Sequence, residues 1–103
     1  MKLIPENILQ PLKEKGFTGE TFCEAVDFFR DENNIFIQYY WMIDEAANRV
    51  VFYFKIDYMY GYRDKEKTYA DWAKRNQEVK VEKWYDEPNE CQIKSIIYAT
   101  ELL

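Results

Sequence analysis

The residues that could carry catalysis are few in this sequence, and none of them has a chemical partner at a useful spacing. The chain has no histidine, which removes the commonest general base and the usual partner of a nucleophile. Ser95 is the only serine, and it stands between Lys94 and Ile96 with no base at a predictable position. Cys23 and Cys91 lack the imidazole that would generate a thiolate. We therefore predict that the protein is not an enzyme.

No signature of a cofactor or metal site occurs either. Neither glycine-rich phosphate-binding pattern, GxxxxGK or GxGxxG, can be built from the three glycines of the chain. Glu24, Asp27 and Asp31 could hold a hard cation such as Mg²⁺, but their spacing is that of any solvated helix face. We expect no cofactor and no bound metal.

The composition is that of one folded domain with an excess of aromatic side chains. The chain has 103 residues, of which 48% are hydrophobic and 18% aromatic, and nine are tyrosines. A chain of this length can bury a core without disulfide or metal staples. Nine tyrosines cannot all lie in that core, and tyrosine tolerates half-burial at interfaces. The net charge of −5 disfavours binding to nucleic-acid phosphate.

The sequence gives no indication of a membrane or of secretion. No apolar run approaches the roughly 20 residues that span a bilayer. Pro5, Glu6 and Asn7 interrupt the apolar residues near the N-terminus, so this segment is not a signal peptide. Cys23 and Cys91 lie far apart with no CxxC spacing, which leaves their pairing open. We predict a cytoplasmic protein.

Two segments of alternating side chains form the centre of the predicted fold. The segments 35–43 and 50–60 are rich in β-branched and aromatic residues, and the polar residues 44–49 separate them. Their period of two predicts two antiparallel strands. The alternation would place Ile35, Ile37, Tyr39, Trp41 and Ile43 on one face of the first strand. In the second strand it would place Val50, Phe52, Phe54, Ile56 and Tyr58 together.

The other segments predict helices and one further strand. Thr21 and Glu24 have the spacing of a capping box and predict a helix over Thr21–Glu32 that ends at Asn33 and Asn34. Pro11 predicts an irregular start followed by a short helix from Pro11 to Lys15. The remaining expected elements are a short helix at Thr68–Arg75, a strand at Glu78–Tyr85, and a helix at Glu90–Leu103 with Ile93, Ile96, Ile97, Thr100 and Leu103 on one face.

These elements predict a single α+β domain over residues 1–103. The expected order is α-α-β-β-(α)-β-α, with a three-stranded antiparallel sheet and helices packed on one face. The other sheet face would then be open to water or to a partner.

Aromatic side chains on the open face are the first candidate binding surface. Such a face can form the centre of a protein interface or stack nucleic-acid bases. The alternative is that the rings pack beneath the short helix and the termini. The candidate residues are Tyr40, Tyr53, Tyr58, Tyr60, Tyr62 and Trp84.

The acidic helix is the second candidate surface, because its carboxylates could replace phosphates in a nucleic-acid-binding groove of a target protein. Its residues are Glu20, Glu24, Asp27, Asp31 and Glu32. We therefore predict an interaction protein with a protein partner. Weak binding of single-stranded nucleic acid and self-association, for example as a homodimer, are the alternatives.

The segment ETFCEAVDFFRDENNIFIQ resembles a pattern in small uncharacterised proteins of gut bacteriophages and prophages. In that pattern a KEKGF-like segment (Lys13–Phe17) precedes a helix motif (Thr21–Arg30), and Asn34-Ile35 opens an aromatic strand. The longer charged connection at Tyr62–Gln77 departs from the pattern. The resemblance implies an accessory protein of phage or mobile-element origin, and it implies no catalytic residues.

The predicted order of elements is also similar to the double-stranded RNA-binding domain. That domain binds phosphate with lysines at the start of its last helix, whereas residues 87–90 of this chain are Glu-Pro-Asn-Glu. The acidic residues at this position argue against binding to duplex RNA.

Overall fold

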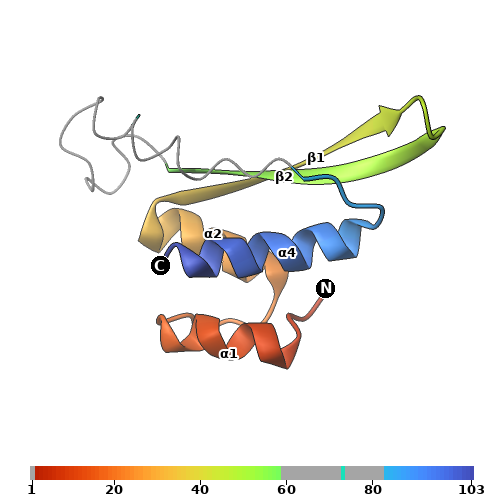
Figure 1. Ribbon diagram of the computed structural model, residues 1–103. Coiled ribbons are helices and arrows are strands. Elements are labelled where there is room, and N and C mark those ends of the chain that lie inside the picture. The colour runs from red at the N-terminus through yellow and green to blue at the C-terminus, as the bar shows by residue number, and fades with distance from the viewer. Residues whose placement is uncertain (1, 59–72, 74–82) are drawn as a thin grey trace.

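The computed structural model describes residues 2–58, 73 and 83–103 in an α+β arrangement of three layers. The elements are α1 (Glu6–Glu14), α2 (Phe22–Asn33), β1 (Ile35–Asp44), β2 (Arg49–Tyr58) and α4 (Pro88–Glu101). In Figure 1 the hairpin of β1 and β2 forms one layer, α2 and α4 lie beneath it, and α1 lies beneath those helices. The predicted helix at Thr68–Arg75 falls outside the described residues except for Ala73. In the ranges given, no helix is both long enough and apolar enough to cross a membrane.

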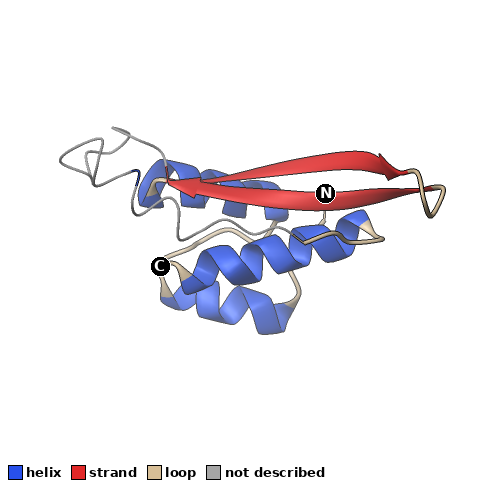
Figure 2. Ribbon diagram, turned by 45° about the horizontal axis from the view of Figure 1, so that its top comes forward, coloured by secondary structure: helices blue, strands red, loops and turns tan. Residues whose placement is uncertain are grey.

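The hairpin that the alternation predicts is present. β1 and β2 pair antiparallel without a bulge, from Ile35 opposite Tyr58 to Asp44 opposite Arg49. Residues directly opposite each other share a face, so the two predicted rows lie together on one side. Figure 2 shows the two long strands over the helices. On the side toward the helices, four residues are buried and belong to the hydrophobic core: Ile35, Ile37, Phe54 and Ile56.

The sheet is two-stranded within the described residues, where three strands were predicted. The described end of the predicted third strand makes a single antiparallel bridge, in which Phe52 and Tyr85 exchange both backbone hydrogen bonds at 2.8 and 2.7 Å. Residues 78–82 lie outside the described part. The bridge still places Trp84 on the open face and Tyr85 on the helix side, because neighbouring residues in an extended chain point to opposite faces.

The capping box predicted for α2 is present. The Thr21 hydroxyl accepts a hydrogen bond from the Glu24 amide at 3.2 Å and donates one to the Glu24 carboxylate at 2.8 Å. At the other end Asn34 adopts the left-handed conformation with φ 63°, and its amide bonds to the Phe29 carbonyl. The helix therefore starts and stops where its sequence signals indicate.

Thr21→Ala tests the contribution of this cap. The variant leaves an orphan amide in the first turn of α2, so we expect a loss of about 1 kcal/mol in the free energy of unfolding. Thr21→Ser keeps the hydroxyl oxygen and should lose much less. Urea denaturation followed by circular dichroism measures both, and equal losses in the two variants would show that the methyl group matters and the cap does not.

The first helix is longer than predicted. It begins at Glu6, directly after Pro5, and continues through Pro11 to Glu14. The missing amide of Pro11 leaves the Asn7 carbonyl without its helical donor, but both residues are exposed, so water can satisfy it. Gly16 (φ 102°) ends the helix, with the Gly16 amide bonded to Lys13 and the Phe17 amide bonded to Leu12, which is a Schellman motif.

The last helix buries a wider surface than the one predicted. Ile96 is buried as expected, but the other buried residues are Cys91, Ser95 and Ala99, spaced four apart, whereas Ile93 and Ile97 are only partly buried against the core. The physical reason is that α4 is a middle-layer helix, with the hairpin on one side and α1 and α2 on others. Small side chains on the sheet side let α4 approach the aromatic rings of the hairpin.

Candidate interaction surfaces

Three of the predicted aromatic residues form one row across the open face of the sheet. Tyr40 lies opposite Tyr53, and the bridge at Phe52 and Tyr85 brings Trp84 beside Tyr53. The Tyr40 and Tyr53 rings are stacked with centroids 4.9 Å apart, and the Tyr53 and Trp84 rings lie 4.8 Å apart at 59°. Tyr40 is 38% exposed and Trp84 is 51% exposed. The row Tyr40–Tyr53–Trp84, called the aromatic row below, is therefore ordered by its own contacts and still open to solvent.

A shallow hollow adjoins the aromatic row toward the hairpin turn. It has a volume of about 710 Å³, and its lining includes Val51, Met42 and Trp84. An ion pair of 2.9 Å between Arg49 and Asp86 lies at its edge. Val51 is buried although it belongs to the open face. The hollow can thus accept an apolar side chain next to a charged pair, as the pocket beside an interface anchor does.

The other predicted members of the aromatic face are placed differently. Tyr58 is only 6% exposed and belongs to the core. Because it lies opposite Ile35, it points to the helix side, and its assignment to the open face was wrong. Tyr60 and Tyr62 lie outside the described residues. The polar end of the open face carries Lys55 and Asp57, which form an ion pair at 3.7 Å.

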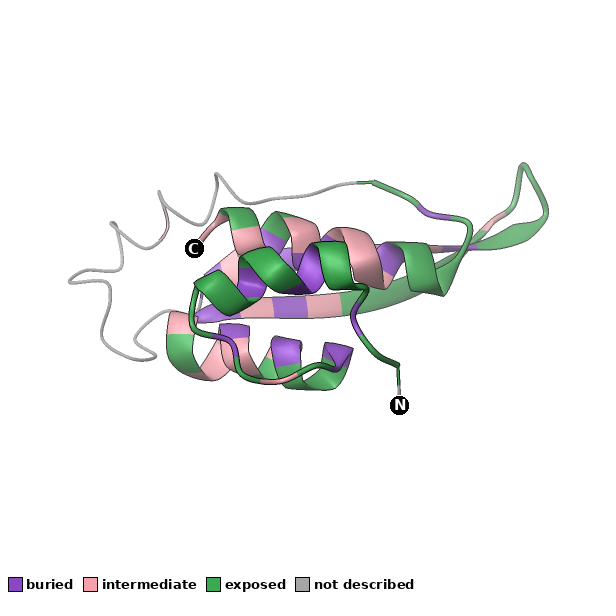
Figure 3. Ribbon diagram, turned by 90° about the horizontal axis from the view of Figure 1, so that it is seen from below, coloured by how far each residue is buried: buried purple, intermediate pink, exposed green. Residues whose placement is uncertain are grey.

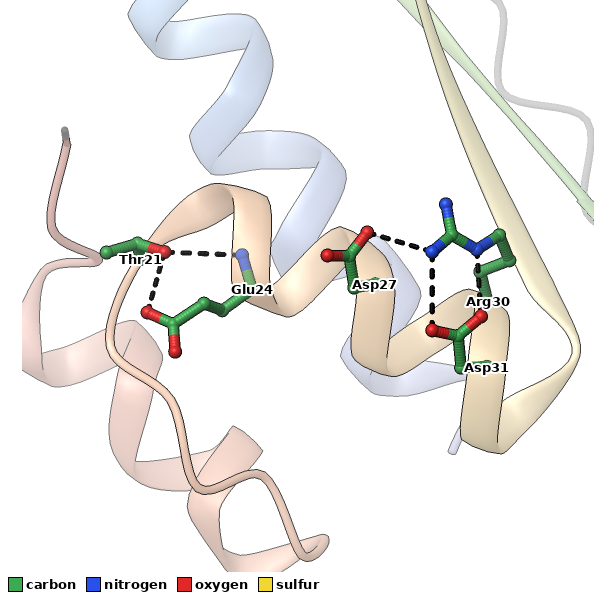
Figure 4. Close-up of polar contacts among 5 residues, drawn as sticks. All are labelled: Thr21, Glu24, Asp27, Arg30 and Asp31. Carbon is green, nitrogen blue, oxygen red and sulfur yellow. Dashed lines mark hydrogen bonds and ion pairs between the residues drawn. The ribbon is translucent and has the colours of Figure 1, made fainter.

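The acidic helix uses its carboxylates within the helix itself (Figure 4). Glu24 is held by the capping box, and its hydrogen bonds from Thr21 and from the Glu20 amide lower the pKa of its carboxyl. Asp27 and Asp31 both bind Arg30, with nitrogen–oxygen distances of 3.0 and 2.9 Å. These three carboxylates therefore have local structural partners that compete with any external cation.

The other two predicted acidic residues lie at the ends of the segment. Glu20 precedes the helix and Glu32 lies in its last turn, and both are exposed. A shallow hollow with Phe17, Phe28 and Gly19 among its lining residues adjoins the acidic side of α2. Among the described residues no group of acidic or cysteine side chains is arranged to hold a metal ion.

A third apolar surface lies on the helix side of the sheet. Trp41, Ile43 and Val50 are 66%, 57% and 44% exposed, and Figure 3 shows the exposed end of the hairpin extending past the helices. Strand length is the signal that predicts this. A strand of ten residues spans about 33 Å, whereas the 14 residues of α4 span about 21 Å. We call Trp41, Ile43 and Val50 the overhang.

Two of the candidate nucleophiles, Ser95 and Cys91, are buried residues of α4. The Ser95 hydroxyl lies 2.5 Å from the Tyr39 hydroxyl and 2.6 Å from the Gln92 carbonyl. Burial raises the pKa of the Cys91 thiol to about 11, and the nearby Glu90 carboxylate adds to the effect. Cys23 is exposed and is not bonded to Cys91. A protonated thiol and a hydroxyl bonded to a phenol are poor nucleophiles at neutral pH.

Comparison with family models, with curated proteins and with solved structures finds no match to this chain. The molecule is thus a small α+β protein whose surfaces are the basis for a functional interpretation.

Proposed function

We propose that this chain is a non-enzymatic interaction protein that binds a protein partner through the aromatic row. The observation that carries the proposal is the continuous contact of Tyr40, Tyr53 and Trp84 on the uncovered sheet face. Tyrosine and tryptophan are the side chains most enriched among residues that dominate binding energy at interfaces. Rings that already stack lose little conformational freedom on binding.

The surroundings of the row favour a protein over a nucleic acid. Two basic groups of the open face are engaged, since Lys55 pairs with Asp57 and Arg49 pairs with Asp86. The net charge of −5 opposes a polyanion at every distance within the Debye length. Weak stacking of single-stranded nucleic acid is the second candidate, favoured only by the exposed rings, and it is an outcome of the test below.

The acidic helix is the weaker protein-binding candidate. Mimicry of phosphates needs several carboxylates free to face cationic groups, whereas Glu24, Asp27 and Asp31 are held within α2. A partner would have to compete with Arg30 and with the helix cap.

The same proposal includes two finer points. A third strand over Glu78–Tyr85 would extend the sheet beyond the bridge at Tyr85 and enlarge the open face. The resemblance of Thr21–Arg30 and its surroundings to phage and prophage proteins suggests an accessory factor that acts on a cytoplasmic host or phage protein.

Comparative capture tests the aromatic row. Wild-type protein and the variant Tyr40→Ser/Trp84→Ser are immobilised in equal amounts and exposed to lysate of the cell that encodes the chain. We expect a partner that wild type retains and the variant loses by at least about 30-fold, the equivalent of 2 kcal/mol. Circular dichroism confirms that the variant is folded.

A matched variant and a titration separate the alternatives. The variant Glu20→Gln/Asp27→Asn/Asp31→Asn/Glu32→Gln should retain the partner, and loss of the partner in this variant alone would transfer the site to α2. Titration with a labelled oligonucleotide at low salt should leave Trp fluorescence unquenched. Saturable quenching that depends on Trp84 would favour the nucleic-acid alternative over the protein partner.

A further inference from the structure

The backbone groups on the outer edge of β1 can be identified from the ladder. Phe52 directs its amide and carbonyl to Tyr85, which lies on the side of β2 away from β1. In an antiparallel ladder the direction alternates along the strand, so the groups of Tyr53 point to β1 and bond Tyr40 opposite it. The remaining residues of β1 therefore direct their backbone outward, and they are Ile35, Ile37, Tyr39, Trp41 and Ile43.

This edge has none of the features that normally prevent strand pairing. Edge strands are usually kept single by lysine, proline, a bulge or short length. β1 has ten residues with the sequence IFIQYYWMID, pairs with β2 without a bulge, and carries its only charge at Asp44. In the described part of the chain β1 pairs only with β2. It presents five amides and five carbonyls in one straight row.

The overhang lies next to this edge, and the described elements likewise leave its apolar side chains exposed. Trp41 and Ile43 belong to β1 and are the most exposed large apolar residues of the helix side. At the start of β1 the situation is reversed, because Ile35 and Ile37 are covered by the helical layer and are buried, with α2 packed beneath β1. One half of the strand is thus covered and the other half is not.

We propose that a second copy of this chain pairs with the outer edge of β1, antiparallel, about a two-fold axis at Tyr39. This register is the one that uses every outward-pointing group, because it sets Tyr39 opposite itself. It sets Ile37 opposite Trp41 of the partner and Ile35 opposite Ile43 of the partner. The result is a four-stranded sheet with an isologous interface.

The two-fold arrangement also covers the overhang of each copy. The axis runs perpendicular to the sheet, so both helical layers lie on the same side and at opposite ends. The uncovered half of each β1 then lies beside the covered half of the other, where α2 forms the flank. The exposed Trp41 of one copy comes next to Ile37, which is 4% exposed at the border of the core. The covered and uncovered halves of one chain are complementary, which is why a second copy fits better than an unrelated strand.

The same register joins the two aromatic rows. In each copy the row crosses the sheet from Trp84 through Tyr53 to Tyr40, and Tyr40 faces the dimer edge. Tyr40 lies opposite Gln38 of the partner, so the two rows adjoin across the axis and form one strip on the open face. The dimer does not depend on the proposed partner site, since pairing uses the β1 edge and the overhang only.

Sedimentation velocity across micromolar to millimolar protein tests the pairing with two tryptophan variants. Trp41→Lys replaces the most exposed apolar side chain of the overhang with a charged one. Trp84→Lys is the matched control, because Trp84 lies on the opposite face of the sheet and on the far side of β2. We expect a dimer for wild type and for Trp84→Lys, and at least tenfold weaker association for Trp41→Lys. Trp41→Pro should behave like Trp41→Lys, because proline is tolerated at a free edge but removes a donor that pairing needs.

Spin-label distances test the register. With Cys23→Ser and a label at Asp44→Cys, the two labels lie ten residue positions apart along the paired strands, because residue 44 is five positions beyond Tyr39 in each copy. Their backbones should be about 33 Å apart. Overlap of the hairpin ends face to face would give about 10 Å, the spacing of stacked sheets, and would overturn the proposal. A wild-type monomer at all concentrations, or equal dimerisation by Trp41→Lys and Trp84→Lys, would overturn it as well.

Discussion

Replacing Phe54 by alanine is expected to lower the free energy of unfolding by about 3 to 5 kcal/mol. The Phe54 side chain is 0% exposed. Its ring is stacked on Tyr85 with centroids 6.0 Å apart and lies 5.9 Å from the ring of Tyr98. Truncation leaves a cavity among β2, the segment at Tyr85 and α4, and neighbours that belong to three elements cannot all move to fill it. Urea denaturation followed by far-ultraviolet circular dichroism measures the loss.

Phe36→Ala is the matched control for this prediction. It removes the same side chain from the same hairpin, but Phe36 lies on the open face and is only partly buried. We expect less than half the loss seen for Phe54→Ala, because the transferred area is smaller and no closed cavity forms. Losses of equal size would show that the two faces of the hairpin are covered to the same extent, which contradicts the described architecture.

Local signals in the sequence were sufficient for the parts of the fold that depend on near neighbours. The capping box at Thr21 and Glu24 and the left-handed stop at Asn34 are contacts within a few residues. The alternation in the hairpin likewise fixes which residues of each strand share a face, as the observed pairing shows. Each of these features is set by the backbone geometry of one segment.

The parts that the sequence predicted incorrectly depend on the surroundings of a segment. Pro11 disfavours a helix by its own chemistry, but Asn7 is exposed, so water can take the place of the missing amide at its carbonyl. The prediction for α4 missed part of its buried surface, because a helix between two layers needs small residues on one side and aliphatic residues on another. Ser95 and Ala99 are the small buried residues of α4, and a search for one apolar stripe does not find them.

The candidate surfaces show the same division. Tyr40, Tyr53 and Trp84 lie on one face, as the alternation of side chains along the strands requires, whereas Tyr58 lies on the other face and is buried. The overhang was not predicted because the alternation of side chains shows which face is apolar and not how far the helices extend beneath it. Strand and helix lengths, compared directly, would have identified Trp41 and Ile43.

Alkaline pH is expected to destabilise the protein through Tyr39 and Cys91. Burial raises the pKa of Tyr39 from 10.0 to about 12, although the hydrogen bond with Ser95 acts in the opposite direction. Burial also raises the pKa of Cys91 from 9.0 to about 11. Tyr85 is shifted upward as well, chiefly because burial disfavours its phenolate. All three groups are thus held neutral by the fold.

The sign of the effect follows from proton binding in the two states. Above pH 9 the unfolded chain has lost the Cys91 proton, and above pH 10 it has lost the Tyr39 proton, while the folded protein still holds both. Stability therefore falls as pH rises and stops falling near pH 11 for Cys91 and near pH 12 for Tyr39. Two full pKa units correspond to about 2.7 kcal/mol. Because Tyr39 is 39% exposed, water screens this residue, and we expect about 1 to 2 kcal/mol from it.

Urea denaturation at a series of pH values from 8 to about 12 measures this dependence. The variant Tyr39→Phe/Cys91→Ala loses stability at pH 8, because a hydrogen bond to Ser95 and a buried thiol are removed, but it should show a shallower decline at higher pH. Tyr40→Phe removes an exposed hydroxyl from the open face and should retain the wild-type decline. If the double variant and wild type lose stability in parallel, the alkaline sensitivity originates in other groups, and burial does not hold the Tyr39 phenol neutral.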